Sequence, residues 1–288
     1  MMAGMLSMVG TPIGNLQDVS PRVRETLEGA DAIFCEDTRV TGKLLAVLGI
    51  HVRLERADEN IIAQKIAPTL ERLESGERIA FVSDAGMPGI SDPGQRLVDA
   101  ALDAALPVEV IPGPSAVICA LVASGLSSDH FFFEGFLPRK AGDQKRRLAE
   151  LAQIPGSLVI YESPRRALQT AEALAEAFPE RRCALVRELT KIHEECVRGQ
   201  APELAEKLAA RPEIKGECVF VVEAPTQEEL TARREAEGTR LPLDKAIAAG
   251  LAEGEPKSAL AKRLAKEYEA SRQDIYAQIL AAAQEDAG

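Results

Sequence analysis

Residues 79–94, IAFVSDAGMPGISDPG, form the most informative stretch of this 288-residue chain. The apolar run 79–82 is typical of a buried strand, and it leads into a loop of glycines, prolines and carboxylates. A helical pattern follows, with Leu97, Val98, Ala101 and Leu102 on one face. Open α/β sheets bind ligands at such strand ends, and loops of this kind carry function more often than they act as spacers. We therefore expect a binding loop here rather than an ordinary turn with extra glycine and proline.

Strand and helix patterns alternate through the first 120 residues. We expect strands over 5–10, 32–35, 52–54, 79–82 and 108–111. Helices are expected from Ser20-Pro21, over 38–48 and 60–73, up to about Ala105, and over 114–124. Because the strands are apolar on both faces and alternate with helices, the pattern predicts a largely parallel sheet covered by helices.

A second α/β unit begins at Phe131. Strands are expected over 131–133, 158–161, 184–186 and 218–222, with an antiparallel strand over 195–198, and helices over 165–178 and 202–210. After Ala224 the composition changes, and helical patterns cover 243–251, 256–268 and 271–283. The predicted fold class is α/β, with two lobes of mostly parallel, mixed sheets and a small C-terminal helical module. The expected domains are 1–124, 125–225 and 226–288.

Composition is that of a soluble globular protein, with 46% hydrophobic and 27% charged residues. No apolar run reaches the ~20 residues that span a bilayer, and we expect no signal peptide. The five cysteines show no CxxC spacing and the three histidines no metal-ligand spacing. We therefore expect reduced thiols, no metal site and a cytoplasmic location.

The net charge of −11 argues against nucleic-acid binding by the whole surface, although two basic clusters interrupt it. The segment 139–147, RKAGDQKRR, holds five cations and one aspartate. A second cluster comprises Lys257, Lys262, Arg263, Lys266 and Arg272. Each cluster taken alone is more typical of a solvated helix face than of a nucleic-acid contact.

Four further loops lie at expected strand ends: GTPIGN (10–15), CEDTR (35–39), IPGPSAV (111–117) and RELTK (187–191). The first is not GxGxxG, and Pro12 blocks the tight dinucleotide turn, so NAD binding is not indicated. An ordinary helix N-cap explains the Ser115 hydroxyl taken alone. The charges of RELTK taken alone are explained by surface ion pairs. Five such loops in one chain favour a shared site.

Together these residues resemble the tetrapyrrole methylase superfamily of S-adenosylmethionine-dependent methyltransferases. The resemblance spans roughly residues 6–224. Within it they are most similar to the branch that methylates the ribose 2′-oxygen of a cytidine in the decoding region of 16S ribosomal RNA. The GxGPGD opening of the tetrapyrrole branch is replaced by GTPIGN, which argues against corrin or sirohaem methylation. The matching motifs are VGTPIGNLQDVSPR (9–22), CEDTR (35–39), SDAGMPGISDPG (83–94), IPGPSA (111–116), YESPRR (161–166), RELTK (187–191) and KGECV (215–219).

The resemblance implies S-adenosyl-L-methionine in a cleft between two α/β lobes, and a homodimer. The cofactor's cationic groups favour Asp84, and its carboxylate favours free backbone N–H groups. Cofactor contacts carried over by motif position are Pro12, Ile13, Asp84, Met87, Ser115, Ala116, Tyr161, Leu189 and Glu217.

A ribose 2′-OH is a poor nucleophile, so a positioned base or cation should assist its attack. Glu36, Asp37, Glu188 and Lys191 are candidates. We favour Asp37 as base or orienting group, with Arg39 and Lys191 holding phosphates or stabilising the alkoxide.

The partner implied is ribosomal RNA or the small ribosomal subunit, and basic side chains would bind its phosphates. The C-terminal helices resemble a helix-turn-helix-like module, but a hairpin that only packs on the enzyme fits them equally. The expected RNA contacts are Arg139, Lys140, Lys145, Arg146, Arg147, Lys257, Lys262 and Arg263.

Two other functions compete with this interpretation. A small-molecule methyltransferase acting on a tetrapyrrole is disfavoured by the GTPIGN loop and by only eleven aromatic residues. A non-enzymatic nucleotide-binding protein is disfavoured because no GxxxxGK[ST] loop occurs and because clustered carboxylates would repel phosphates.

Overall fold

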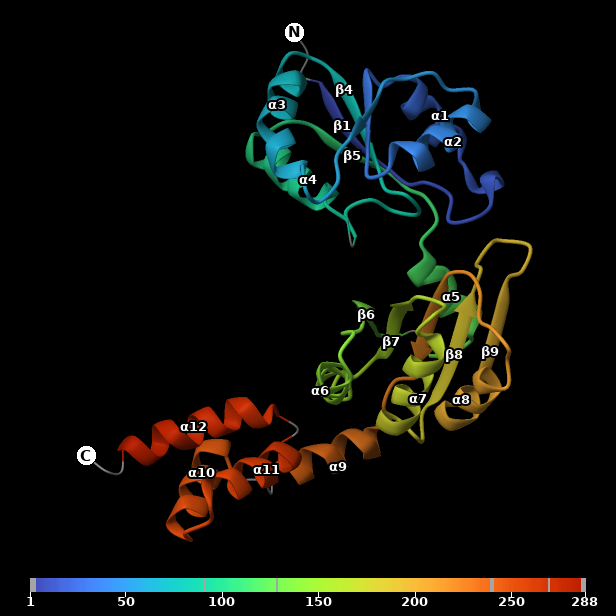
Figure 1. The fold of residues 1–288 in the computed structure, drawn as a ribbon. Helices are drawn as coiled ribbons and strands as arrows, with labels where there is room; N and C mark the ends of the chain where they lie inside the picture. Colours follow the sequence, from blue (N-terminus) through green and yellow to red (C-terminus); the bar gives the residue numbers. More distant parts are fainter. Residues whose placement is uncertain (1–3, 91, 128, 239–240, 269, 286–288) are drawn as a thin grey trace. The chain divides into compact units, whose positions relative to one another are not determined.

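A computed structural model describes residues 4–90, 92–127, 129–238, 241–268 and 270–285 (Figure 1). The chain divides into two compact units. The first comprises Met1–Gly125, Leu185–Val197 and Gly216–Val219, and the second comprises Leu126–Ala184, Arg198–Lys215 and Phe220–Gly288. The first unit contains the whole first stretch of alternating strands and helices, whereas the second stretch is divided between the two units.

The first unit is built on a five-stranded sheet of order β3-β2-β4-β1-β5, in which every neighbouring pair is parallel. This confirms the predicted parallel sheet. The strands are β1 (Met5–Val9), β2 (Ala32–Cys35), β3 (Leu54–Arg56), β4 (Arg78–Val82) and β5 (Val108–Ile111). The helices are η1 (Leu16–Asp18), α1 (Pro21–Glu28), α2 (Thr38–Leu48), α3 (Ile62–Glu74), α4 (Gly94–Asp103) and α5 (Ala116–Ser124).

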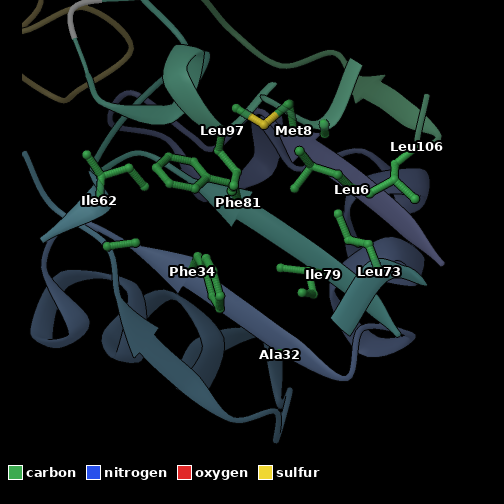
Figure 2. Close-up of a cluster of buried hydrophobic side chains, with 12 residues drawn as sticks. Leu6, Met8, Ala32, Phe34, Ile62, Leu73, Ile79, Phe81, Leu97 and Leu106 are labelled. Carbon is green, nitrogen blue, oxygen red and sulfur yellow. The ribbon is translucent and has the colours of Figure 1, made fainter. Parts of the chain in front are cut away.

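Side chains alternate between two hydrophobic clusters along each central strand, as the pleat of a strand requires. On β4, Ile79 and Phe81 point into a cluster that includes residues of α3 and α4 (Figure 2), whereas Ala80 and Val82 join residues of α1 and α2. Helices therefore cover both faces of the sheet. Its polar groups are left at the strand ends, where the loops of the site begin.

The edge strand β3 lies two residues later than the strand predicted over 52–54. The prediction followed apolar residues, but the observed strand carries Glu55, which is held by ion pairs from α3. Lys65 Nζ lies 2.7 Å and Arg72 Nη1 2.9 Å from the Glu55 carboxylate. Both cations also lie over the Phe34 ring. Charge pairing at the sheet edge, which a hydrophobic pattern does not report, positions this strand.

The second sheet has the order β6-β7-β10-β8-β9; β6 and β7 belong to the second unit, whereas residues of β8, β9 and β10 are divided between the two units. Its strands are β6 (Phe131–Phe136), β7 (Ser157–Glu162), β8 (Arg182–Arg187), β9 (Glu195–Gln200) and β10 (Cys218–Val222). Its helices are α6 (Ala141–Leu151), α7 (Ala167–Ala177) and α8 (Ala201–Ala209). The connection between β8 and β9 is too short for a crossover, so this neighbouring pair is antiparallel, as predicted. Helix α6 was not among the predicted elements, although a solvated helix face was one interpretation of its basic segment.

The C-terminal helices are α9 (Gln227–Gly238), α10 (Leu243–Ala252), α11 (Lys257–Glu267) and α12 (Arg272–Glu285). The last three correspond to the predicted helical patterns and share a core that includes Leu260, Leu264, Ile275 and Ile279. Helix α9 was missed. It is tied to the residue that precedes β8 by Glu229, whose carboxylate accepts three hydrogen bonds from the buried Arg181 guanidinium. None of the helices in the described ranges has the length and apolar character needed to cross a bilayer.

Candidate active site

The loops after β1 and β4 are joined by a pair of backbone hydrogen bonds. Thr11 N donates to Gly86 O at 2.9 Å, and Gly86 N donates to Thr11 O at 3.1 Å. Gly86 has φ of +81°, a conformation that glycine adopts without strain. A side chain there would also meet Ile13 and the Pro114 carbonyl. The two loops therefore form one structural element at the carboxyl ends of adjacent strands.

The loop after β5 joins them through a close approach of two glycines. A Cβ atom on Gly10 would lie 2.5 Å from Gly113 N and 2.8 Å from Met87 Sδ. Gly113 N donates to Met87 Sδ at 3.1 Å. Three loops that are separate in the sequence thus pack with no space for a side chain between Gly10 and Gly113.

Asp92 holds the loop after β4 in shape. Its carboxylate accepts hydrogen bonds from Gly89 N and Gly94 N at 2.8–2.9 Å. Burial of the Asp92 carboxyl raises its pKa despite these bonds. Asp92 is therefore a structural member of the loop.

Three further carboxylates gather where β2 and β4 end. Asp84 Oδ1 accepts a hydrogen bond from Asp37 N at 3.2 Å, which ties the CEDTR and SDAG loops together. Burial, reinforced by the negative charges of Asp92 and Asp84, raises the pKa of Glu36 above its ordinary value. Glu36 consequently holds a proton more readily than an exposed glutamate does.

Asp37 is differently placed. It is the N-cap of α2, where its Oδ1 accepts from Arg39 N at 2.8 Å. The Arg39 guanidinium also donates to both carboxylate oxygens, at 3.0 and 2.6 Å. These bonds from Arg39 hold the pKa of Asp37 well below its usual range. Such a carboxylate is a weak proton acceptor but a well-oriented one.

The RELTK loop contains two strained residues. Glu188 and Thr190 have φ of +51° and +65°, which is uncommon for residues with a side chain. Glu188 Oε1 accepts from Glu217 N at 3.1 Å and from Lys191 Nζ at 3.0 Å. Lys191 Nζ also lies 3.2 Å from Glu217 Oε2. Strain maintained by so many contacts is frequent at functional sites.

The RELTK loop packs against the GTPIGN loop at Gly14. A Cβ atom on Gly14 would lie 2.6 Å from Lys191 Cγ and 2.8 Å from Thr190 Oγ1. Burial disfavours the charge of Lys191, but its hydrogen bond to Glu188 and the charge of Glu217 outweigh this and raise its pKa. Thr190 Oγ1 is buried and has no hydrogen-bond partner among the described residues. The hydrogen-bonding capacity of this buried hydroxyl is therefore not satisfied by the described residues.

Most residues expected at the site lie on these joined loops of the first unit: Pro12, Ile13, Asp37, Arg39, Asp84, Met87, Ser115, Ala116, Glu188, Leu189, Lys191 and Glu217. Tyr161 lies in the second unit, where its ring contacts Phe133 and Phe136. Ser115 occupies the N-cap position of α5 but makes no capping hydrogen bond, so capping does not account for its hydroxyl.

Thr11, Gly113 and Thr190 were not predicted as site residues. These residues matter because they make contacts between loops that are distant in the sequence. The only sequence signal for them was their position in the GTPIGN, IPGPSA and RELTK motifs. No group of histidine, cysteine, aspartate and glutamate within the described residues is arranged to hold a metal ion.

The expected RNA contacts separate into paired and unpaired cations. In the first cluster, Lys145 pairs with Glu176, Arg146 with Asp143, and Arg147 with Glu134 and Glu150. In the second cluster, Arg263 pairs with Glu255 and Glu267. Among the expected RNA contacts, Arg139, Lys140, Lys257 and Lys262 are exposed and form no ion pair with a described residue.

A family model described as "Tetrapyrrole (Corrin/Porphyrin) Methylases" matches residues 5–205. The chain is 42% identical over 279 residues to "Ribosomal RNA small subunit methyltransferase I" of Streptococcus pyogenes, covering 96% of this chain and 94% of that protein. It is also 42% identical over 276 residues to the protein of the same name from Mesorhizobium japonicum, covering 96% and 91%.

A solved structure with the same fold is uroporphyrin-III C-methyltransferase from Thermus thermophilus complexed with S-adenosyl homocysteine. It matches with a TM-score of 0.53 and 18% identity, over 76% of this chain and 97% of that chain. At that identity the likeness establishes the fold alone. The family match covers more than half the chain and agrees with the full-length relatives, so this chain belongs to the tetrapyrrole (corrin/porphyrin) methylase family.

Proposed function

We propose that the protein is an S-adenosylmethionine-dependent methyltransferase that modifies the ribose 2′-oxygen of a cytidine in the decoding region of 16S ribosomal RNA. The observation that carries the proposal is the joining of the GTPIGN, SDAGMPG, IPGPSA and RELTK loops through Thr11–Gly86, Gly10–Gly113 and Gly14–Lys191. The rRNA substrate rests on the names of the full-length relatives. The choice of the 2′-oxygen as the methylated atom and of cytidine as the modified nucleotide rests on the motif resemblance.

The residues present fit the cofactor. Asp84 is an exposed carboxylate suited to the cofactor's ammonium or sulfonium, and the unpartnered Thr190 hydroxyl together with Ser115 offers hydrogen bonds to its polar groups. Pro12, Ile13, Met87, Ala116, Leu189, Glu217 and Tyr161 complete the proposed contacts. When bound, the cofactor supplies an electrophilic methyl group on a sulfonium.

We assign the chain's own groups by their surroundings. Glu36, with its raised pKa, is the better proton acceptor, whereas Asp37 fixes Arg39 and α2 and acts as an orienting group. Arg39, 86% exposed, is available to a phosphate. Lys191, held charged beside Glu188, would offset negative charge on the attacking oxygen.

Two substitutions test these assignments. Glu36→Gln should lower turnover by about 10²–10⁴-fold with little change in cofactor affinity, as expected for loss of a general base. Asp37→Asn keeps the oxygen that caps α2 and should have a smaller effect on turnover. Equal turnover of Glu36→Gln and the wild type would remove Glu36 from the mechanism.

Transfer of a labelled methyl group tests the activity itself. The purified protein, labelled S-adenosylmethionine and unmodified small subunits should yield label in 16S RNA, at the 2′-oxygen of a cytidine after nuclease digestion. Uroporphyrinogen as acceptor tests the alternative, a tetrapyrrole-type methyltransferase. Label in the macrocycle and none in RNA would refute the proposal.

We further propose a homodimeric cytoplasmic enzyme with domains 1–124, 125–225 and 226–288. The C-terminal helices would grip RNA through Lys257 and Lys262, together with Arg263. Removing residues 241–288 leaves Glu229 beside Arg181 and should weaken RNA binding while cofactor binding remains. Unchanged RNA binding would favour a hairpin that only packs on the enzyme.

A further inference from the structure

Two neighbouring turns of the second unit carry exposed cations, of which Arg139 and Lys140 are expected RNA contacts, and the proposed function does not state which form of RNA they bind. Strands β6 and β7 are parallel and end in register, with Phe136 opposite Tyr161. The turns that follow them, 137–140 and 163–166, therefore leave the sheet at the same edge. Both contain exposed basic residues.

Arg166 joins the two turns. Its guanidinium donates to Leu137 O at 3.3 Å and to Pro138 O at 3.0 Å. Buried Glu162 lies 3.5 Å from the same guanidinium, and its carboxylate also accepts from Thr170 Oγ1 at 2.7 Å. These contacts hold the backbone of both turns, and they therefore position the neighbouring residues of each turn.

Three residues of these turns are cations whose charge is not neutralised by an ion pair with a described residue. Arg139, Lys140 and Arg165 are exposed, and none forms an ion pair with a described residue. On the nearby helix α6, by contrast, Arg146 and Arg147 are neutralised by Asp143, Glu134 and Glu150. Unpaired arginine and lysine side chains bind phosphate without first breaking an internal ion pair.

An exposed aromatic residue directly precedes the first of these turns. Phe136, the last residue of β6, is 62% exposed, and its ring centroid is 5.8 Å from that of Tyr161. Proteins that bind single-stranded nucleic acid combine cations for the backbone with aromatic rings on which bases stack. A duplex, whose bases are already stacked, would leave the ring unused.

We propose that Phe136, Arg139, Lys140 and Arg165 form a binding surface for a single-stranded RNA segment, with Arg166 as the residue that positions both turns. The cations contact phosphates and a base stacks on Phe136. The proposal rests on the RNA methyltransferase function and identifies the form of RNA that this face accepts.

The salt dependence of binding tests the cations. A labelled single-stranded RNA of roughly 12 nucleotides is titrated with the protein over a range of salt concentrations. Arg139→Ala, Lys140→Ala and Arg165→Ala should each reduce the slope of log K against log salt by about 0.7. Arg182→Ala, which removes an exposed arginine that is paired with Glu223 and is not an expected RNA contact, is the matched control and should leave the slope unchanged. Unchanged slopes for all three test variants would overturn the proposal.

Phe136 is tested by substitutions that separate stacking from apolar contact. Phe136→Leu should weaken binding of the single strand about tenfold without changing the salt slope, whereas Phe136→Tyr should bind like the wild type. A duplex of the same sequence should not distinguish the three proteins. If Phe136→Leu alters the oligomeric state in size-exclusion chromatography and leaves RNA binding intact, the ring covers a protein interface and the proposal is wrong.

The positioning role of Arg166 is tested by a double-mutant cycle. Arg166→Lys, the milder change, cannot bridge both carbonyls and should weaken RNA binding several-fold. That loss should disappear in a protein already lacking Arg139, Lys140 and Arg165. Persistence of the full loss would show that Arg166 acts elsewhere.

Failure of the enzyme proposal is recognised separately. A wild-type protein that transfers no methyl group to ribosomal RNA refutes the proposed function. A wild-type protein that methylates RNA, with the surface variants equally active and equally tight in binding, refutes only this surface.

Discussion

Replacing Gly10 by alanine tests whether the loops of the site are packed as described. The added Cβ would lie 2.5 Å from Gly113 N and 2.8 Å from Met87 Sδ. Gly113 is backbone on a second loop, so the clash cannot be relieved by rotating a side chain. Because ordinary contacts of a Cβ begin near 3.4 Å, one loop must move by about 0.9 Å.

The expected cost follows from that displacement. Overpacking of this kind destabilises a protein by about 1–3 kcal/mol, which corresponds to a fall in melting temperature of roughly 2–4 °C per kcal/mol for a domain somewhat smaller than this chain. A displacement of nearly 1 Å in a catalytic loop can lower the rate by ~10²-fold. We therefore expect a folded protein with strongly impaired cofactor binding and turnover.

Calorimetric titration with S-adenosylmethionine and a thermal melt measure both effects. Gly142→Ala is the matched control: a Cβ there has no neighbour within 4 Å, and the residue lies in α6. Alanine should leave stability unchanged or slightly raised at that position. A Gly10→Ala protein with wild-type melting temperature and cofactor affinity would refute the close approach of the two loops.

Three further substitutions have definite expected outcomes. Burial and neighbouring carboxylates raise the pKa of Glu36, so stability is lost as the pH rises through that pKa. Glu36→Gln should therefore melt higher than the wild type at pH 7, and the difference should vanish below about pH 4; an equal melting temperature at pH 7 would contradict the burial. Glu229→Gln leaves the buried Arg181 guanidinium without its counter-charge and should cost about 3 kcal/mol by denaturant unfolding, with earlier proteolytic cleavage near α9; undiminished stability would show that the pair does not anchor α9. Gly216→Ala, at φ +83° and against Glu188, should destabilise the protein and reduce turnover, whereas wild-type kinetics would show that the RELTK loop is adaptable.

Apolar strands were predicted best because burial on both faces leaves a strong pattern. The strands over 32–35, 108–111 and 218–222 and the helix over 38–48 coincide with β2, β5, β10 and α2. The start of α1 was equally clear: Ser20 Oγ accepts from Val23 N, and Pro21 occupies the first turn. Local chemistry alone determines these elements.

Elements that depend on partners distant in sequence were predicted less well. Strand β3 was displaced by two residues because Glu55 is held by cations on α3. Helix α9 was missed because it is mostly polar, and its anchor, Arg181, lies 48 residues earlier. The basic clusters were treated as uniform, although their ion pairs involve acids on other elements, such as Glu134 and Glu176.

The sequence by itself determined the α/β class, the sheet strands and the loops that carry the site, since hydrophobic period and glycine, proline and carboxylate spacing are local properties. Only the tertiary structure decided which groups in those loops are available for chemistry. It distinguishes Glu36, whose pKa is raised, from Asp37, whose pKa is lowered, and it leaves the Thr190 hydroxyl without a hydrogen-bond partner among the described residues. The physical reason is that burial, hydrogen bonding and charge pairing depend on neighbours that the fold supplies from far along the chain.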